Sequence, residues 1–381
     1  MAIIRVDVKP ELLRWACDRA GDGEGALRKK FANLDAWIRG ETRPTLKQLE
    51  EFARAARVAI GYLFLPEPPI ERLPIRDMRT VGGKGVRRPS PNLLDMIYLC
   101  QQRQGWYRDF AERHDEDPIA FVGSVTLATA PTDVAADMRR TFDFDMAARR
   151  GCPNPIELMR LFIDRVEESG VLVMVSGVVK NSTNRVLDAE EFRGFALADP
   201  LAPVVFVNGA DSKPAQMFTL AHELAHLWLG ESAVSDVSLN TMASEATERW
   251  CNLVAAEFLV PLAELKRMAE ADPLGRFEAY RQAFKVSRPV VLRRLLDARL
   301  ISRSEFDEEY ARAFQQAAIN RPQSSGGDFY NTLPIRASKR FVRAILASVK
   351  SGETSYTETF QLLGIKNIKT LRGISHKVGV V

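Results

Sequence analysis

The segment FTLAHELAHLWLGE, from Phe218 to Glu231, places two of the chain's four histidines four residues apart, with a glutamate between them. In an α-helix, residues i and i+4 lie one above the other on the same face, so His222 and His226 can direct imidazole nitrogens at one metal ion. The surrounding residues are mostly apolar. An apolar helix gains nothing from burying three titratable groups unless a cation compensates them, so the pattern favours a metal-binding helix over a surface helix with solvated histidines.

A third metal ligand is expected downstream, because a catalytic zinc site normally takes three protein ligands and one water. The stretch ASEATERWCNLVAAEFLVP offers Glu245, Glu248 and Glu257. At 100° per residue, Glu248 shares a helix face with Asn252 and small side chains, whereas Glu257 shares the opposite face with bulky apolar ones. We therefore expect Glu248 to be the ligand and Asn252 to support it by a hydrogen bond, with Glu257 as the competing choice.

This set of residues has a definite chemistry. With one zinc ion on His222, His226 and Glu248, the pKa of a bound water can fall to about 7. Glu223 is then placed to act as the general base that takes the proton of the attacking water and passes it to a leaving amine. The expected reaction is hydrolysis of a peptide bond. Zinc is the expected ion, and Mn²⁺ or Fe²⁺ suits the same three ligands.

Composition bounds the class of protein. The chain has 381 residues, of which 46% are apolar and 27% charged, as in a soluble globular protein of two or three domains. No apolar run reaches the ~18 to 20 residues that a membrane span needs, and the start of the chain lacks a signal-peptide pattern. The four cysteines are scattered without a CxxC pair, which argues against a disulfide framework or a cysteine zinc site. We expect a cytoplasmic protein with no membrane partner.

The sequence predicts an α+β fold in which a small sheet packs on the HExxH helix and on the helix that follows it. Apolar, β-branched runs such as VLVMVSGVV predict buried strands ahead of the HExxH helix. We expect a helical module with a proline-rich connector over residues 1–80, a helical connecting region over 81–150, the metal domain with a helical extension over 151–318, and a basic helical domain over 328–381.

The residues from about Ile156 to Pro261 resemble the ImmA/IrrE family of metallopeptidases. The resemblance rests on FTLAHELAHLWL together with ERWCNLVAAEFLVP, which is similar to the family's E-x-x-[AC]-N-x-x-A-A-x-x-L-x-P helix. It implies Glu248 as the third ligand, in agreement with the helix-face argument. It also implies a substrate class, since members of the family cleave helix-turn-helix repressors.

The N-terminal region is similar to the Xre-type module of long members of that family, on the strength of W-x-x-G-x-x-x-P-T from Trp37 to Thr45 and of LFLPEPP. The segment between Gly21 and Trp37 is short for a DNA-reading helix-turn-helix, so docking of a protein is the alternative to base readout. Long members also resemble the antitoxin-like partners of PIN-type nucleases. The resemblance thus implies a toxin as a further partner.

A basic C-terminal segment raises a nucleic-acid hypothesis. From Pro334 to Val381 there are nine Lys or Arg and two Glu. Lys366, Lys369 and Arg372 recur every three residues and can present one basic edge to phosphates. No set of side chains suited to base readout stands out. We expect weak DNA binding with little sequence preference, and a solvated face of a protein-binding domain is the alternative explanation of these charges.

Two classes of function therefore compete. The first is a zinc endopeptidase that acts on a DNA-binding regulator. The second is a DNA-binding regulator, or an antitoxin-like partner of a PIN-type toxin, in which the metal domain senses or stabilises. Hydrolysis needs Glu223, whereas a metal-stabilised binding module needs only the three ligands.

The stretch INRPQSSGGD, from Ile319 to Asp328, has the composition of a linker. Limited proteolysis of the folded protein should therefore cut between about Asn320 and Asp328, because exposed small and polar residues are the preferred sites of nicking. Mass spectrometry of the fragments locates the cut. Resistance in this stretch, with cleavage inside the metal domain instead, would count against the boundary.

Overall fold

A computed structural model describes residues 4–20, 24–79, 89–235, 246–269, 272–319 and 328–380. Its contacts divide the chain into two compact units, one formed by residues 1–74 and 88–95 and the other by 75–87 and 96–381. The linker residues 320–327, and Glu245 among the proposed ligands, lie outside the described residues. Within the described part of the chain, no helix is long and apolar enough to span a bilayer.

The smaller unit is helical, as the sequence predicts. Its elements are α1 (Pro10–Ala20), α2 (Glu24–Lys30), α3 (Leu34–Ile38), α4 (Leu46–Ala56) and the 3₁₀ turn η2 (Ile60–Phe64). Thr45 starts α4 with a capping box, since its hydroxyl accepts from the Gln48 amide at 3.2 Å and the Gln48 side chain accepts from the Thr45 amide at 2.9 Å. Leu49, Phe52, Ala53 and Ala56 form the buried apolar face of α4, whereas Leu46 is 39% exposed.

The larger unit is α+β, which confirms the predicted fold class. Its sheet has five strands, which are β1 (Arg76–Asp77), β2 (Leu172–Ser176), β3 (Gly194–Leu197), β4 (Val204–Asn208) and β5 (Ala233–Ser235). The strand order is β1-β5-β3-β4-β2. The central strand β3 runs antiparallel to β4 and β5, while β1 is parallel to β5 and β2 is parallel to β4.

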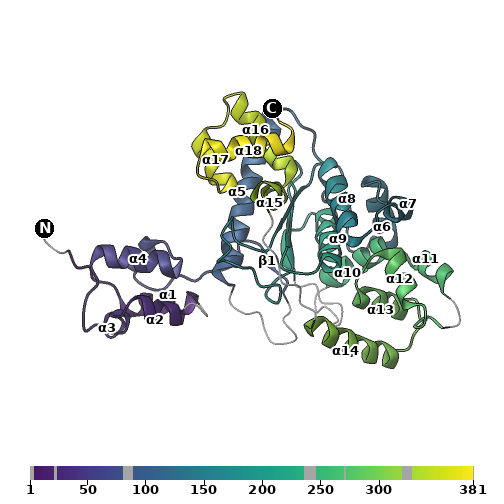
Figure 1. The fold of residues 1–381 in the computed structure, drawn as a ribbon, viewed down its shortest axis with the longest axis horizontal. Helices are drawn as coiled ribbons and strands as arrows, with labels where there is room; N and C mark the ends of the chain where they lie inside the picture. The colour runs from purple at the N-terminus through teal and green to yellow at the C-terminus, as the bar shows by residue number, and fades with distance from the viewer. Residues whose placement is uncertain are drawn as a thin grey trace. The chain divides into compact units, whose positions relative to one another are not determined.

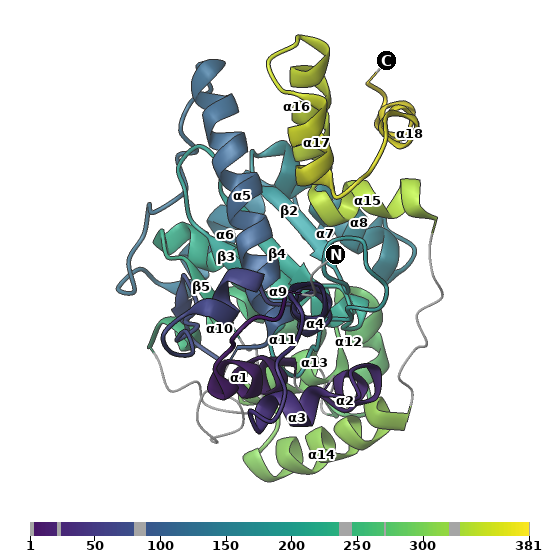
Figure 2. The same cartoon turned by 90° about the vertical axis from the view of Figure 1, so that its left-hand side faces the viewer.

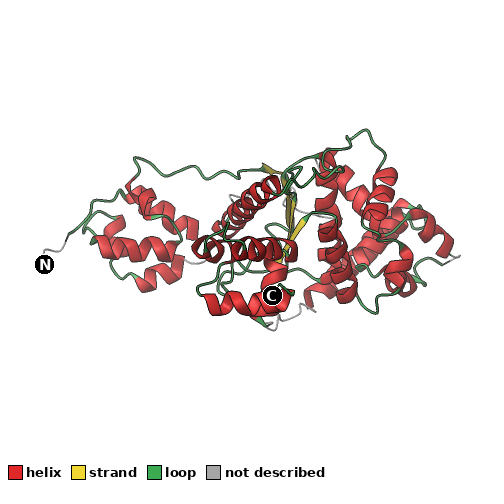
Figure 3. Ribbon diagram, turned by 90° about the horizontal axis from the view of Figure 1, so that it is seen from above, coloured by secondary structure: helices red, strands yellow, loops and turns green. Residues whose placement is uncertain are grey.

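Helices cover both faces of this sheet, and the strands appear between two sets of helices (Figures 1 and 3). On one face, α8 (Pro155–Glu168) packs on β2, and α9 (Lys213–Leu229) packs on β3 and β4. On the other face, α15 (Phe329–Ala337) packs on β2, and α5 (Pro91–Arg113) crosses the strands (Figure 2). Because successive strand residues point to opposite faces, Val173 and Val175 join the core beneath α9, while Met174 meets Cys100 of α5.

The other helices of the larger unit extend the core around α9. They are α6 (Pro131–Thr141), α7 (Met146–Arg150), α10 (Ala246–Leu259), α11 (Leu262–Met268), α12 (Phe277–Phe284), α13 (Arg288–Asp297) and α14 (Arg303–Ile319). Residues of α6 belong to this core and do not merely connect two regions: Asp137 accepts a hydrogen bond from Trp228 of α9 at 3.0 Å, and Arg139 donates to the Glu257 carbonyl of α10 at 2.8 Å. The boundaries near residues 80, 150 and 318 remain predictions.

The C-terminal helices pack on the same unit. They are α15, α16 (Lys339–Lys350), α17 (Tyr356–Leu363) and α18 (Ile368–Val378). Arg103 of α5, which is 3% exposed, donates to the carbonyls of Leu362 at 3.0 Å and Arg336 at 3.1 Å. Arg340 donates to the Tyr107 hydroxyl at 2.7 Å, and Lys339 pairs with Asp164 at 2.6 Å. Part of the basic charge counted in the sequence is therefore used to dock the segment.

The carboxylate of Glu167, near the end of α8, meets the start of α16. It accepts hydrogen bonds from the Ser338 hydroxyl at 2.5 Å and from the Lys339 amide at 2.9 Å. Burial raises the pKa of Glu167 to about 7, although these hydrogen bonds and the charge of Lys339 act in the opposite direction. Glu167 therefore makes the docking of the C-terminal helices sensitive to pH.

A folded-state pKa above the ordinary 4.5 means that the folded protein binds this proton more tightly than the unfolded chain. The contribution of this proton to the stability of the folded protein is full below about pH 4.5 and is lost as the pH rises to about 7. The free energy of unfolding in urea should fall over this window with a slope of up to about 1.4 kcal/mol per pH unit from this group. Glu167→Gln should flatten the slope and the exposed neighbour Glu168→Gln should not. Equal slopes for the wild type and Glu167→Gln would contradict this role.

Candidate metal centre

Helix α9 carries both histidines of the HELAH motif deep into the core. It contains Pro214 in its first turn and ends at Gly230, whose φ of 71° lies in the left-handed region that glycine adopts readily. Its residues from Gln216 to Trp228 are all buried, so the helix has no solvated face along this stretch. His222 and His226 are both 0% exposed, which excludes the reading of a surface helix with solvated histidines.

The structure brings Glu248 of α10 to the two histidines. The Nε2 atoms of His222 and His226 are 3.2 Å apart, and the Glu248 carboxylate lies 3.3 Å from the first and 3.1 Å from the second. One ligand atom from each residue lies within 4.8 Å of the others. Glu248 is 3% exposed, so the whole group is buried. Within the described residues, this is the one cluster of three or more His, Cys, Asp or Glu side chains with such geometry.

Hydrogen bonding shows that this group suits a cation. His222 Nδ1 lies 3.0 Å from Asn252 Oδ1, and with that oxygen as acceptor the ring carries its proton on Nδ1. His222 Nε2 then presents a lone pair to the space that it shares with His226 and Glu248. Converging lone pairs and a carboxylate repel one another unless a cation or protons lie between them, so the donor set fits a divalent metal. Asn252 was expected to support Glu248, and the structure places it on His222 instead.

The charges of the group are set by its neighbours. Burial opposes ionisation of Glu248, but His222 and His226 outweigh it and hold the pKa of this carboxyl below its ordinary value. Burial lowers the pKa of His226, which favours its neutral, metal-binding form. Burial, together with the charge of Glu248, raises the pKa of Glu223 well above its ordinary value.

Glu223 lies in the same buried space, and neither of its carboxylate oxygens forms a hydrogen bond of good geometry among the described residues, although the Ser235 hydroxyl is near enough to favour its ionised form. Gly194 of β3 makes room for it: a Cβ at that position would stand 2.9 Å from Glu223 Oε1 and 2.6 Å from Thr219 Cγ2. Gly194 is not among the residues predicted for the site. A glycine inside the strand pattern FRGFALAD is the signal for such a close approach.

Glu257, the rival for the third ligand, lies elsewhere. Its carboxylate forms a buried ion pair with Arg294 and accepts from the Leu262 amide at 3.3 Å. These contacts tie the end of α10 to α11 and α13. Glu257 is absent from the cluster around the two histidines, and its contacts give it a packing role.

The family comparison coincides with this geometry. Residues 166–296 match the peptidase family Peptidase_M78, described as the IrrE N-terminal-like domain. The match covers 131 of the 381 residues, including α9 and α10 with the HELAH motif and Glu248. The chain therefore contains a segment of metallopeptidase type. A second family model, DUF8813, describes a domain of unknown function and matches residues 337–377. These residues span α16 to most of α18. No curated protein matches the chain.

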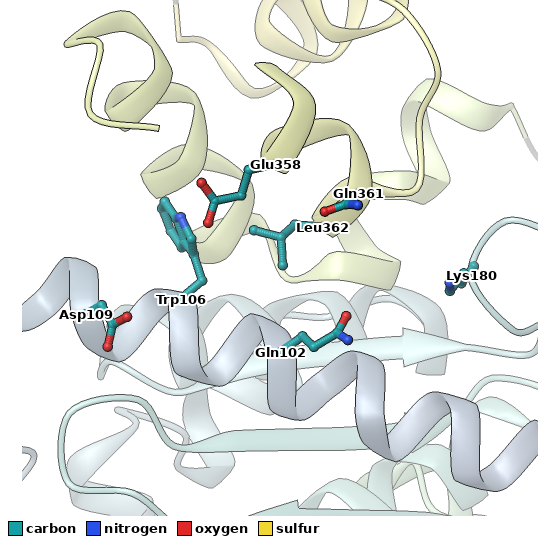
Figure 4. A pocket seen from close by; sticks show the side chains of 7 residues that line it. All are labelled: Gln102, Trp106, Asp109, Lys180, Glu358, Gln361 and Leu362. Atoms are coloured by element: carbon teal, nitrogen blue, oxygen red, sulfur yellow. The ribbon is translucent and has the colours of Figure 1, made fainter. Parts of the chain in front are cut away.

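A surface pocket of about 520 Å³ is lined by residues of α5, of α17 and of the loop after β2 (Figure 4). Helix α5 contributes Gln102, Trp106 and Asp109, helix α17 contributes Glu358, Gln361 and Leu362, and Lys180 comes from the loop after β2. None of these residues belongs to the His-His-Glu cluster. The pocket is a feature of the docking between α5 and the C-terminal helices.

The three predicted nucleic-acid residues have no contact with the metal group. Lys366 lies between α17 and α18, Lys369 and Arg372 lie on α18, and all three are exposed. Gly364 ends α17 in the left-handed conformation, with φ of 66°, and α18 begins after the N-cap residue Asn367. The DNA-binding role of these residues remains a prediction.

The two candidates for the third ligand are both buried glutamates of α10, so substituting each of them separately tests which one binds the metal. Glu248→Gln should weaken Co²⁺ or Zn²⁺ binding in isothermal titration calorimetry by at least about tenfold, whereas Glu257→Gln should leave the affinity unchanged. Asn252→Ala should weaken it by about 10- to 100-fold, as is typical when a histidine ligand loses its hydrogen-bond acceptor. Circular dichroism checks that each variant is folded. Loss of metal in Glu257→Gln with full affinity in Glu248→Gln would refute the assignment.

Proposed function

We propose that this chain is a zinc-dependent endopeptidase that cleaves a DNA-binding regulatory protein of the helix-turn-helix repressor class. The observation that carries the proposal is the buried convergence of His222, His226 and Glu248 beside the carboxylate of Glu223. The match to a peptidase family over the same residues supports it. A site built only to stabilise a fold has no need of a fourth buried group, an acid with no hydrogen bond of good geometry among the described residues, next to the ligands.

Each residue of the site has a distinct role in the proposed hydrolysis. Bound zinc would polarise the scissile carbonyl and lower the pKa of a water molecule. Glu223 accepts a proton from that water as its oxygen attacks the carbonyl carbon, and then donates the proton to the leaving amine nitrogen. Asn252 fixes the ring of His222 through Nδ1, which keeps Nε2 free as a ligand. The apolar shell of α9 excludes bulk water and strengthens each of these electrostatic interactions.

The identity of the substrate rests on the resemblance to the ImmA/IrrE family and not on a contact in this structure. Manganese or iron suits the same three ligands, and the ion loaded in cells depends on availability as well as on affinity. The N-terminal helical unit would then bind a regulatory protein or DNA.

The competing proposal is a DNA-binding regulator, or an antitoxin-like partner of a PIN-type toxin, with a sensing or stabilising metal domain. The exposed Lys366, Lys369 and Arg372 favour contact with phosphates, and the docked Lys339 and Arg340 are engaged in the protein itself. Three surface cations allow only weak, salt-dependent binding. The peptidase proposal therefore ranks first.

Glu223→Gln separates the two proposals, because it removes the base and leaves the three ligands in place. Zinc-loaded protein should be incubated with helix-turn-helix regulators encoded beside it, and the fragments identified by mass spectrometry. The wild type should cut one of them, and Glu223→Gln should lower the rate by about 10²- to 10⁴-fold while keeping its zinc.

The matched control is Glu264→Gln on the surface of α11, which should cut at the wild-type rate. Wild-type activity in Glu223→Gln would show that Glu223 is not the base. A zinc-loaded wild type that cuts no regulator, while the chain binds a toxin or DNA, would favour the binding module.

A further inference from the structure

The metal group is closed over by strand β5. Ser235, the last residue of β5, is 0% exposed, and its hydroxyl lies 3.3 Å from His226 Nε2 and 3.3 Å from Glu248 Oε1. The hydroxyl thus stands directly against two of the ligand atoms. His222, His226 and Glu223 are all 0% exposed as well. Ser235 therefore contributes to the closure of this group from solvent.

Strand β5 also occupies the side of β3 that faces away from β4. It pairs antiparallel with β3 through Gly194↔Ser235, Phe195↔Val234 and Ala196↔Ala233. Gly194 lies so near Glu223 that a Cβ at this position would stand 2.9 Å from Glu223 Oε1. An extended peptide gains affinity by adding to a strand edge through main-chain hydrogen bonds, and here that edge of β3 is already taken by the chain itself.

Strand β1 fastens β5 from its outer side. Arg76 is in register with Ala233 and Asp77 with Val234, and the Met78 amide donates to the Val234 carbonyl at 3.0 Å. Arg79, which is 1% exposed, then clamps the segment. Its guanidinium donates to both Asp77 oxygens, at 2.8 and 2.7 Å, and pairs at 3.3 Å with Glu191, just before β3.

We propose that Arg76–Arg79 and Ala233–Ser235 form an inhibitory strap that keeps the metal group closed, so that hydrolysis requires the strap to lift from β3. The inference rests on the proposed peptidase function for its consequence, but the strap itself is a property of the fold. Residues Arg76–Arg79 follow directly on the proline-rich connector from the smaller unit. The strap therefore places a segment that is distant in sequence in control of access to the catalytic group.

One experiment loosens the strap in the full-length protein. Met78→Pro removes the amide that donates to Val234, whereas Met78→Leu keeps the amide and most of the buried volume. Hydrogen–deuterium exchange of residues 230–235, measured by mass spectrometry without metal, should be at least about tenfold faster in Met78→Pro than in Met78→Leu or the wild type. Extraction of bound Co²⁺ by EDTA should accelerate in the same order. Equal exchange in the two variants would overturn the strap.

A second experiment fixes the strap in place with an engineered disulfide bond. Registered positions on adjacent strands lie at a distance that a disulfide can span, about 4.4–6.8 Å between Cα atoms, so Arg76→Cys with Ala233→Cys should cross-link β1 to β5. The oxidised double variant should release Co²⁺ to EDTA at least about tenfold more slowly than the same protein reduced by tris(carboxyethyl)phosphine. Oxidised protein should also fail to cut fluorescein-labelled casein, and reduction should restore cutting. The single variant Arg76→Cys is the control and should not respond to reduction.

The outcomes separate this inference from the function on which it rests. If no form of the protein binds Co²⁺, the peptidase proposal fails, and amide exchange still decides whether the strap exists. If the protein binds Co²⁺ but no form cuts casein, the assay with helix-turn-helix regulators decides the peptidase activity, and Co²⁺ release decides the strap. If the reduced protein hydrolyses casein and the cross-linked form hydrolyses it equally well, the peptidase proposal stands and the strap is refuted.

Discussion

The structure depends on the burial of two imidazoles and a carboxylate in an apolar core. His222, His226 and Glu248 lie among the side chains of the main hydrophobic cluster, with their ligand atoms about one hydrogen-bond length apart. Such groups are costly to bury unless something compensates their charge and lone pairs. A divalent cation provides that compensation, and the remaining features serve to hold the three ligands in place. The sheet supports α9, helix α10 packs against α9, and α6 packs against α10. Asn252 orients the ring of His222.

Much of the metal group is predictable from the sequence because the relative positions of its residues follow from their spacing within single helices. The spacing of His222 and His226 on one helix fixes their relation to each other, and the helical period places Glu248 and Asn252 on one face of the next helix. The same argument places Glu257 on another face, where the structure shows it paired with Arg294. Buried strands are likewise visible as apolar runs, and β2 (Leu172–Ser176) falls within the predicted run VLVMVSGVV.

The parts that sequence reasoning missed depend on contacts between distant segments. No local pattern pairs Arg76 with Ala233, because a strand of two residues has no period of its own and its partner lies more than 150 positions away. Ser235 meets His226 and Glu248 only because β5 pairs with β3 in one register. The basic C-terminal segment also could not be interpreted from its sequence. Arg340 and Arg372 each add one positive charge, but Arg340 donates a hydrogen bond to Tyr107 whereas Arg372 is exposed. Charge in the sequence does not distinguish a docking contact from a surface for a partner.

The central claim is that His222, His226 and Glu248 hold one catalytic metal ion. X-ray diffraction from crystals of the zinc-loaded full-length protein, with anomalous data collected at the zinc edge, tests it most directly. The account predicts a single anomalous peak bonded to Nε2 of both histidines and to the Glu248 carboxylate, at about 2.0–2.2 Å. A zinc ion held by other residues, or no peak at these three side chains in protein saturated with zinc, would contradict it.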